Sequence, residues 1–278
     1  MSASAIVILV LVVTLVGVML SSASVARRRR DPTPVSEGFL HLLGHVYVRL
    51  VHRLTVDVEE GAFDEIDGPL LVVVNHTAGV DPILVSSVIP RRVHWLMAED
   101  MRVPMLDWFW DWIGVIFIAR NRHGRTGLRR ARKHLADGGV IGIFPEGHIE
   151  RPHGRLLPFA VGVGVLVQRT GAKVLPVIVD GTPETPSAWD SLYTGSEARV
   201  RVKKPIVYSG RSMSSAEITA DLQAHFVQWT GWDVGERPGH GERDSAGDEP
   251  EEPEGTGEAR GNDRAGVIRA RRASRRIA

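Results

Sequence analysis

The sequence predicts an α/β fold, in which one domain has a mostly parallel central sheet flanked by helices. Short apolar runs rich in β-branched residues alternate with segments of helical periodicity from residue 70 onward. The first run, Leu70–Val74, directly follows Gly68-Pro69 and has the continuous apolar character of a buried strand. A chain of 278 residues is long enough for one large domain or two small ones. The regular alternation of strands and helices favours one large domain.

The first 30 residues are predicted to form a membrane anchor. The segment from Ala5 to Leu20 carries no charge, and small residues extend it to Ala26. A helix of this length spans about 33 Å, enough for a bilayer core. Arg27–Arg30 follow at once, and the positive-inside tendency places them and the following domain on the cytoplasmic face. A cleaved signal peptide is the alternative, but no basic residue precedes the apolar run.

Residues 36–53 are predicted to form an amphipathic helix. Its apolar side chains share one face, and they are Phe39, Leu43, Val46, Tyr47, Leu50 and Val51. Packing against the core explains such a face. The alternative, raised by the nearby anchor, is that the helix lies on the membrane surface.

The elements that follow alternate along the chain. Apolar runs predict strands at 70–74, 93–97, 115–118, 140–144, 174–179 and 199–207. Helical patterns predict helices at 82–89, 104–112, 126–136 and 158–169. In the third helix, Thr126 is the expected N-cap and Gly138 the expected stop. A last helix is predicted to begin at the capping box Ser214-Ser215-Ala216-Glu217.

Composition divides the chain into three parts. Residues 1–30 are the anchor with its basic flank, and residues 36–234 are the folded domain. Residues 235–278 are rich in Gly, Pro, Glu, Asp and Arg. This last part has too few apolar residues to bury a core, so we expect a disordered tail.

Charge is nearly balanced, with 34 Lys and Arg against 33 Asp and Glu, but it is unevenly distributed. Basic residues are concentrated at 101–160 and acidic ones between Glu236 and Glu258. A basic centre favours an anionic partner such as a phosphate ester or a lipid headgroup. No nucleic acid is expected, because no recognition module accompanies the basic run at 129–133. The chain has no cysteine, which excludes disulfides and thiolate catalysis.

A histidine and an aspartate follow the first buried strand in the segment Asn75-His76-Thr77-Ala78-Gly79-Val80-Asp81. Asp81-Pro82 is expected to be a helix N-cap followed by proline at the first helical position. The chain then turns back between the two, which allows the Asp81 carboxylate to reach one nitrogen of His76. The other nitrogen stays free and basic, as a general base requires. A structural histidine is the alternative for this motif taken alone.

Three further segments end predicted strands with polar or turn residues. They are Gly114–Arg120, Val140–Gly147 and Val174–Thr182. An arginine at a strand end, such as Arg120, suits bidentate binding of a phosphate. Glu146 lies at the tip of a turn formed by Pro145 and Gly147, where loops of α/β folds collect functional groups.

The order N-H-x4-D, G-x-x-F-I-x-R, F-P-E-G and V-x-P-V resembles the lysophospholipid acyltransferase family, whose type members are the 1-acylglycerol-3-phosphate acyltransferases. The resemblance covers about residues 40–210. It implies transfer of a fatty acyl group from acyl-CoA or acyl carrier protein to the hydroxyl of a membrane lipid acceptor, without a cofactor or metal. It also implies that His76 is the general base and Asp81 its orienting partner. Acceptor binding would fall to Arg120, Phe144, Pro145, Glu146 and Gly147.

The sequence departs from the family pattern on the acceptor side. His148-Ile149 follows F-P-E-G where Thr-Arg or Ser-Arg is common, and Ala78 replaces a frequent serine. Ala160-Val161-Gly162 stands where a lysine is usual. Two alternatives therefore stay open: an acyltransferase for a glycolipid or other non-glycerol-phosphate acceptor, and a non-catalytic protein that binds lipid or CoA. The sequence makes no prediction of the oligomeric state.

Overall fold

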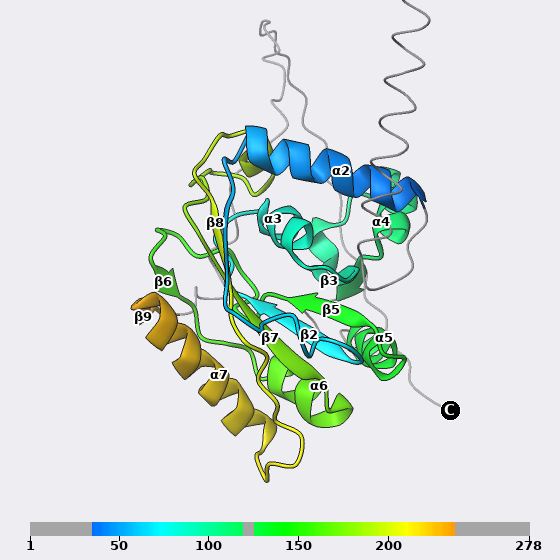
Figure 1. The fold of residues 1–278 in the computed structure, drawn as a ribbon, viewed down its shortest axis with the longest axis vertical. Helices are drawn as coiled ribbons and strands as arrows, with labels where there is room; N and C mark the ends of the chain where they lie inside the picture. Colours follow the sequence, from blue (N-terminus) through cyan, green and yellow to red (C-terminus); the bar gives the residue numbers. More distant parts are fainter. Residues whose placement is uncertain (1–34, 119–124, 237–278) are drawn as a thin grey trace, which may run out of the picture. The chain divides into compact units, whose positions relative to one another are not determined.

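The computed structural model describes residues 35–118 and 125–236. Its centre is a seven-stranded sheet in the order β1-β8-β7-β2-β5-β3-β4 (Figure 1). The strands are β1 (Thr55–Val58), β2 (Leu70–Val74), β3 (Val93–Ala98), β4 (Ile116–Ile118), β5 (Val140–Ile143), β7 (Lys173–Asp180) and β8 (Arg199–Val202). A separate parallel pair joins β6 (Arg155–Leu156) to β9 (Asp233–Val234).

The sheet is mostly parallel, as predicted. The strands β7, β2, β5, β3 and β4 all run in one direction. Only the contact between β7 and β8 is antiparallel, and β1 runs parallel to β8. Because parallel strands end at the same edge, the segments that follow β2, β5 and β7 meet there.

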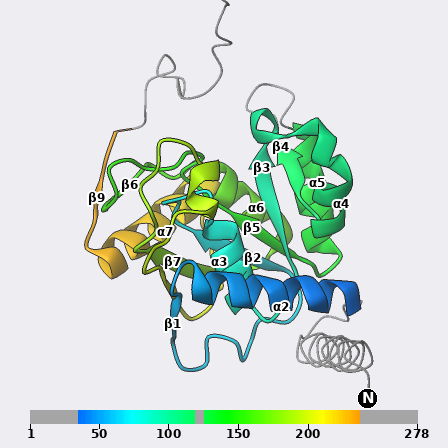
Figure 2. The same ribbon diagram turned by 90° about the horizontal axis from the view of Figure 1, so that it is seen from above.

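Helices cover both faces of the sheet (Figures 1 and 2). The helices are α2 (Val35–Leu50), α3 (Asp81–Val88), α4 (Asp107–Ile113), α5 (Arg125–Ala136), α6 (Gly162–Thr170) and α7 (Ser215–Thr230). Short 3₁₀ helices are η1 (Glu99–Met101), η2 (Pro104–Leu106) and η4 (Trp189–Leu192). Helices α2 and α3 contribute to one apolar core, and α5, α6 and α7 contribute to the other.

Strand β2 lies between the two cores, and this position explains why its sequence is apolar throughout. Leu70, Val72 and Val74 belong to the core shared with α2 and α3, whereas Leu71 and Val73 face the opposite core. All five residues are 0% exposed. A strand that is buried on both faces needs a continuous apolar run.

The structure corrects the bounds of several predicted elements. Helix α2 ends at Leu50, not at residue 53. Helix α6 begins at Gly162, not at residue 158, because the backbone N–H of Ala160 bonds the carbonyl of Pro145 instead of starting a helix. Strand β8 ends at Val202, not at residue 207. Pro205, which has no N–H, interrupts the ladder, and Ile206 then forms an isolated bridge with Val174.

Of the predicted helix ends, the N-cap of α5 is wrong, whereas the stop of α5 and the capping box of α7 are confirmed. Helix α5 already includes Arg125, so Thr126 lies inside the helix and is not its N-cap. Gly138 follows the helix with a φ of +82°, as expected of a stop. The capping box at the start of α7 is confirmed, because Ser214 and Glu217 satisfy each other's backbone N–H groups.

The predicted anchor at 1–30 lies outside the described residues. So does the predicted tail at 235–278, apart from its first two residues. Among the helices in the described ranges, none has both the length and the apolar character needed to cross a membrane.

Candidate active site

The candidate site is built on the turn between β2 and α3. His76 Nδ1 lies 3.0 Å from Asp81 Oδ2. A carboxylate oxygen only accepts, so Nδ1 carries the proton and the neutral imidazole keeps its lone pair on Nε2. Within 35–118 and 125–236, no group hydrogen-bonds Nε2, and 18% of the His76 side chain is exposed. Nε2 is not among the buried side-chain atoms that lack a hydrogen-bond partner in the described part of the chain, so a small reactant has access to it.

Asp81 is not the N-cap that the sequence predicted. It is the first residue of α3, the cap position belongs to Val80, and no side chain caps the helix. The Asp81 carboxylate points back into the preceding turn instead. There Oδ2 accepts hydrogen bonds from the backbone N–H groups of Thr77 at 2.7 Å and Ala78 at 2.9 Å. These donors meet the need of a carboxylate that is 0% exposed.

Neighbouring polar side chains tie this turn to the end of β7. The Asn75 amide donates to the carbonyl of Val179 and accepts from its N–H, both at 2.8 Å. The Thr182 hydroxyl donates to Thr77 Oγ1 at 2.8 Å. The amide of Asn75 thus continues the ladder between β2 and β7 and fixes the backbone just before His76.

The imidazole of His76 is one layer of an aromatic stack. Its ring centroid lies 4.0 Å from that of Phe144 with an interplanar angle of 18°. Phe144 in turn stacks on Trp95 at 5.0 Å. The indole of Trp95 is anchored by a hydrogen bond to Ser86 of α3 at 2.9 Å. The stack sets the plane of the imidazole, which the bond to Asp81 alone does not.

Glu146 lies against the backbone of His76 and is 2% exposed. Its Oε1 accepts from the N–H of His76 at 2.9 Å, and its Oε2 accepts from the N–H of Leu157 at 2.8 Å. Burial raises the pKa of Glu146 to about 8, although the two backbone hydrogen bonds oppose the shift. Of the two influences, burial is the larger.

The other residues predicted to bind the acceptor differ in how exposed they are. Pro145 is buried, and Gly147 is exposed and has a φ of +75°, which a side chain would strain. Arg120 lies outside the described residues. The structure therefore brings Phe144, Pro145, Glu146 and Gly147 to the turn that carries His76.

Sequence reasoning missed several contacts at the site. His153 donates a hydrogen bond from Nε2 to the carbonyl of Thr77 at 2.7 Å. The backbone N–H of His153 donates to Glu184 Oε1 at 2.6 Å. The N–H of Glu150 bonds the carbonyl of His76 at 3.1 Å. The segment His148–His153, which departs from the family pattern, thus packs on the histidine turn. Its sequence shows no periodicity that could have indicated this contact.

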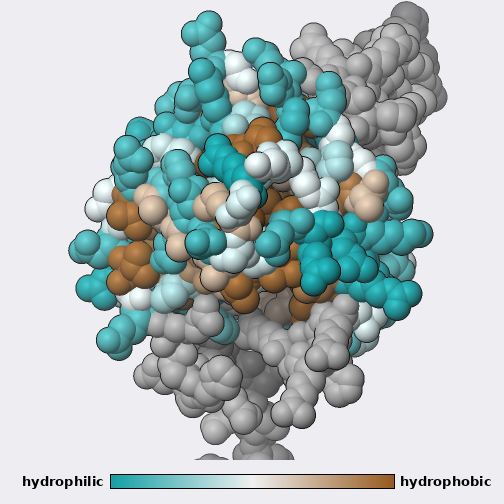
Figure 3. Space-filling model, turned by 90° about the horizontal axis from the view of Figure 1, so that it is seen from below, coloured by the Kyte–Doolittle hydropathy of each residue, from teal (hydrophilic) through white to brown (hydrophobic). Residues whose placement is uncertain are grey.

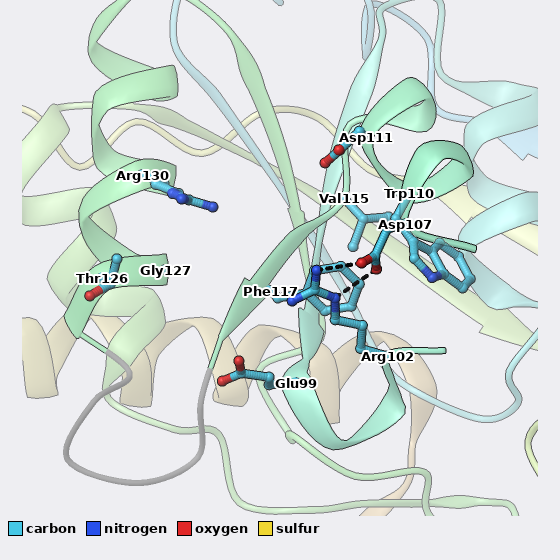
Figure 4. A pocket seen from close by; sticks show the side chains of 10 residues that line it. All are labelled: Glu99, Arg102, Asp107, Trp110, Asp111, Val115, Phe117, Thr126, Gly127 and Arg130. Atoms are coloured by element: carbon cyan, nitrogen blue, oxygen red, sulfur yellow. Dashed lines mark hydrogen bonds and ion pairs between the residues drawn. The ribbon is translucent and has the colours of Figure 1, made fainter. Parts of the chain in front are cut away.

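A pocket of about 360 Å³ lies at the same edge of the sheet, beyond β3 and β4 (Figure 4). Its walls come from η1, α4, β4 and the start of α5, and its charged residues are Glu99, Arg102, Asp107, Asp111 and Arg130. Arg102 forms a bidentate pair with Asp107, with both distances 2.8 Å. His76 is not among the residues that line the pocket. No group of three or more His, Asp or Glu side chains suited to a metal occurs in the described part of the chain.

Comparison with known proteins gives the family. The Acyltransferase family model matches residues 37–180, and the chain belongs to that family. Two curated relatives are each 27% identical to it. One is the chloroplastic 1-acyl-sn-glycerol-3-phosphate acyltransferase BAT2 of Brassica napus, matched over 50% of this chain and 41% of its own length. The other is the 1-acyl-sn-glycerol-3-phosphate acyltransferase of Helicobacter pylori, matched over 43% of this chain and 51% of its own length.

A solved structure confirms the fold. The crystal structure of the 1-acyl-sn-glycerophosphate acyltransferase PlsC from Thermotoga maritima matches with a TM-score of 0.57. The match covers 79% of this chain and 90% of PlsC, with 22% sequence identity. In sequence, the chain spans only about half the length of the curated relatives it matches.

Proposed function

We propose that this protein is an O-acyltransferase that moves a fatty acyl group from a thioester to the hydroxyl of a lysophospholipid such as 1-acylglycerol-3-phosphate. The observation that carries the proposal is the His76–Asp81 pair, with Nδ1 bonded to the carboxylate and Nε2 open. Family membership supports it, and so does the likeness to two 1-acyl-sn-glycerol-3-phosphate acyltransferases.

In the proposed reaction, Nε2 of His76 accepts the proton of the acceptor hydroxyl as its oxygen attacks the thioester carbonyl. The buried charge of Asp81 stabilises the imidazolium that forms. The tetrahedral intermediate then expels the thiolate, which takes the proton back from Nε2. An ester bond replaces the thioester, and the histidine returns to its starting state. General-base assistance of this kind is typically worth about 10²–10⁴-fold in rate.

The donor is acyl-CoA or acyl carrier protein, and the reaction as written needs no cofactor. The acceptor is a membrane lipid, so the protein must work at a bilayer surface. Exposed apolar side chains on α2 support such a surface, because Leu43, Val46 and Leu50 are 48%, 49% and 75% exposed. They lie at helical spacing on the element that follows the predicted anchor.

The test is transfer of labelled acyl groups from acyl-CoA into a membrane lipid extract. The expected result is label in one lipid species, whose mass then names the acceptor. If folded protein transfers label to no lipid from either thioester donor, the alternative of a lipid- or CoA-binding protein replaces this proposal.

A second acceptor class is favoured by the segment after F-P-E-G. Ile149 stands where family members commonly carry arginine, and the guanidinium of Arg151 is bonded to the carbonyl of Pro186 at 2.9 Å. A glycolipid or another acceptor without a glycerol phosphate fits such a site. The substitution Ile149→Arg distinguishes the two classes: a rise in activity on 1-acylglycerol-3-phosphate favours the first, and no rise favours the second.

A further inference from the structure

Glu146 belongs to a motif expected to bind the acceptor, yet its carboxyl group points into the protein. At 2% exposure it has almost no surface for a substrate. Both of its oxygens already accept hydrogen bonds from backbone N–H groups, one from His76 and one from Leu157. A carboxyl group used in this way has little capacity left for a ligand.

The two residues bonded to Glu146 come from separate parts of the chain. His76 follows β2, and Leu157 follows β6. The carboxyl group therefore joins the histidine turn to the segment that returns towards α6. The N–H of Glu150 bonds the carbonyl of His76 at 3.1 Å, so the F-P-E-G turn and its continuation hold both backbone polar groups of His76.

We propose that Glu146 is a positioning residue, which fixes the backbone of His76 and thereby directs Nε2 at the acceptor hydroxyl, and that it does not bind the acceptor. This inference rests on the proposed function. It gives Glu146 a role in turnover and leaves recognition of the acceptor's polar group to other residues.

The chemistry of the bridge explains why a carboxyl group is needed. Two N–H groups approach two different oxygens, and each oxygen keeps a lone pair for its N–H whether the carboxyl group is ionised or protonated. Glutamine offers one oxygen and one NH₂ group, and the NH₂ group would face an N–H donor. One buried hydrogen bond would be lost, and a buried N–H would be left without its acceptor. A displacement of His76 by about 1 Å is enough to cost about a hundredfold in rate.

The kinetic test compares Glu146→Gln and Glu146→Asp with the wild type, using acyl-CoA and 1-acylglycerol-3-phosphate as substrates. Asp221→Asn is the matched control, because it removes a carboxylate of α7 that accepts a hydrogen bond from Tyr208 at 2.6 Å. Tyr208 packs in the core opposite the one to which Ala78 and Val80 of the histidine turn belong. We expect kcat to fall by about tenfold to a hundredfold in both Glu146 variants. The acceptor KM should stay within about twofold of the wild type. A raised acceptor KM with an unchanged kcat would overturn the proposal.

A spectroscopic test separates this inference from the proposed function. In protein labelled with ¹⁵N-histidine, the His76 imidazole signals are assigned by their loss in His76→Ala. We expect Glu146→Gln to shift these signals, and Asp221→Asn to leave them unchanged. Unchanged His76 signals in folded Glu146→Gln would rule out positioning. Because this measurement needs no activity, it gives an answer even if the wild type transfers no acyl group. If Glu146→Gln fails to fold, Glu146→Asp is measured in its place.

Discussion

His76 is held at every polar atom except the one that would react. Its N–H, its carbonyl and its Nδ1 are bonded to Glu146, Glu150 and Asp81, and its ring stacks on Phe144. Such support places the imidazole without reorganisation when a substrate arrives. The sequence predicted the pairing of His76 with Asp81 because the four residues between them form a turn that brings the two side chains together. It did not predict the inward direction of Glu146, because a motif does not specify which way a side chain points.

Glu146 also predicts a dependence of stability on pH. Burial raises its pKa from 4.5 to about 8 in the folded state, so over this window the folded protein binds a proton that the unfolded chain has released. The contribution of Glu146 to the free energy of unfolding is complete below about pH 4.5 and is lost as the pH rises through about 8. We expect the free energy of unfolding of the wild type to fall more steeply between these values than that of Glu146→Gln. Urea titrations at several pH values measure this, and parallel curves would contradict it.

At the scale of elements, the segment after β7 closes against the histidine turn. A Cβ placed on Gly79 would lie 2.2 Å from the backbone oxygen of Ala188, just before η4. The indole of Trp189 contacts Trp110 of α4 at 6.3 Å between ring centroids. Gly79, which has no side chain, thus allows a backbone segment to approach the histidine turn closely.

Gly79→Ala is therefore expected to force the two segments apart. Overpacking of this kind typically costs about 1–3 kcal/mol of unfolding free energy, and acyl transfer should fall because Asp81 and His76 flank the displaced residue. Gly44→Ala is the matched control: it lies in α2 with no atom within 4 Å of the added Cβ. It should be neutral or stabilising by about 1 kcal/mol at most. Denaturant unfolding compares the two, and equal stabilities would contradict the close approach.

Most elements of the sheet could be predicted because burial on both faces leaves a clear pattern. The run Leu70–Val74 is an example, and as β2 it pairs in parallel with both β5 and β7. The errors arose where backbone hydrogen bonds, not side-chain periodicity, decide the outcome. Ala160 bonds Pro145 and delays α6, and Pro205 ends the regular pairing of β8.

In the whole molecule, α2 packs on the core and also keeps apolar side chains exposed. Val48 is 3% exposed and packs in the core together with Tyr47, whereas Leu43, Val46 and Leu50 remain exposed. The apolar face of α2 is therefore wider than the part of it that packs on the core. Viewed from below, the face opposite α2 has much hydrophilic surface, with apolar residues scattered in it (Figure 3).

We predict that α2 rests on the bilayer that carries the acceptor. The double substitution Leu43→Glu and Leu50→Glu should lower transfer to an acceptor in vesicles by about tenfold or more, because two charges would enter the interface. Transfer to the same acceptor in detergent micelles should change little. Val207→Glu, at a position 38% exposed elsewhere on the molecule, is the control. Equal losses in vesicles and micelles would show that the helix acts only through stability.

A comparison of the wild type with His76→Ala shows directly whether His76 is the general base. Wild type and His76→Ala, both shown to be folded by circular dichroism, are compared for acyl transfer from acyl-CoA at saturating acceptor. We expect His76→Ala to lose at least about a hundredfold in kcat. A His76→Ala protein that transfers acyl groups within about twofold of the wild type would contradict it.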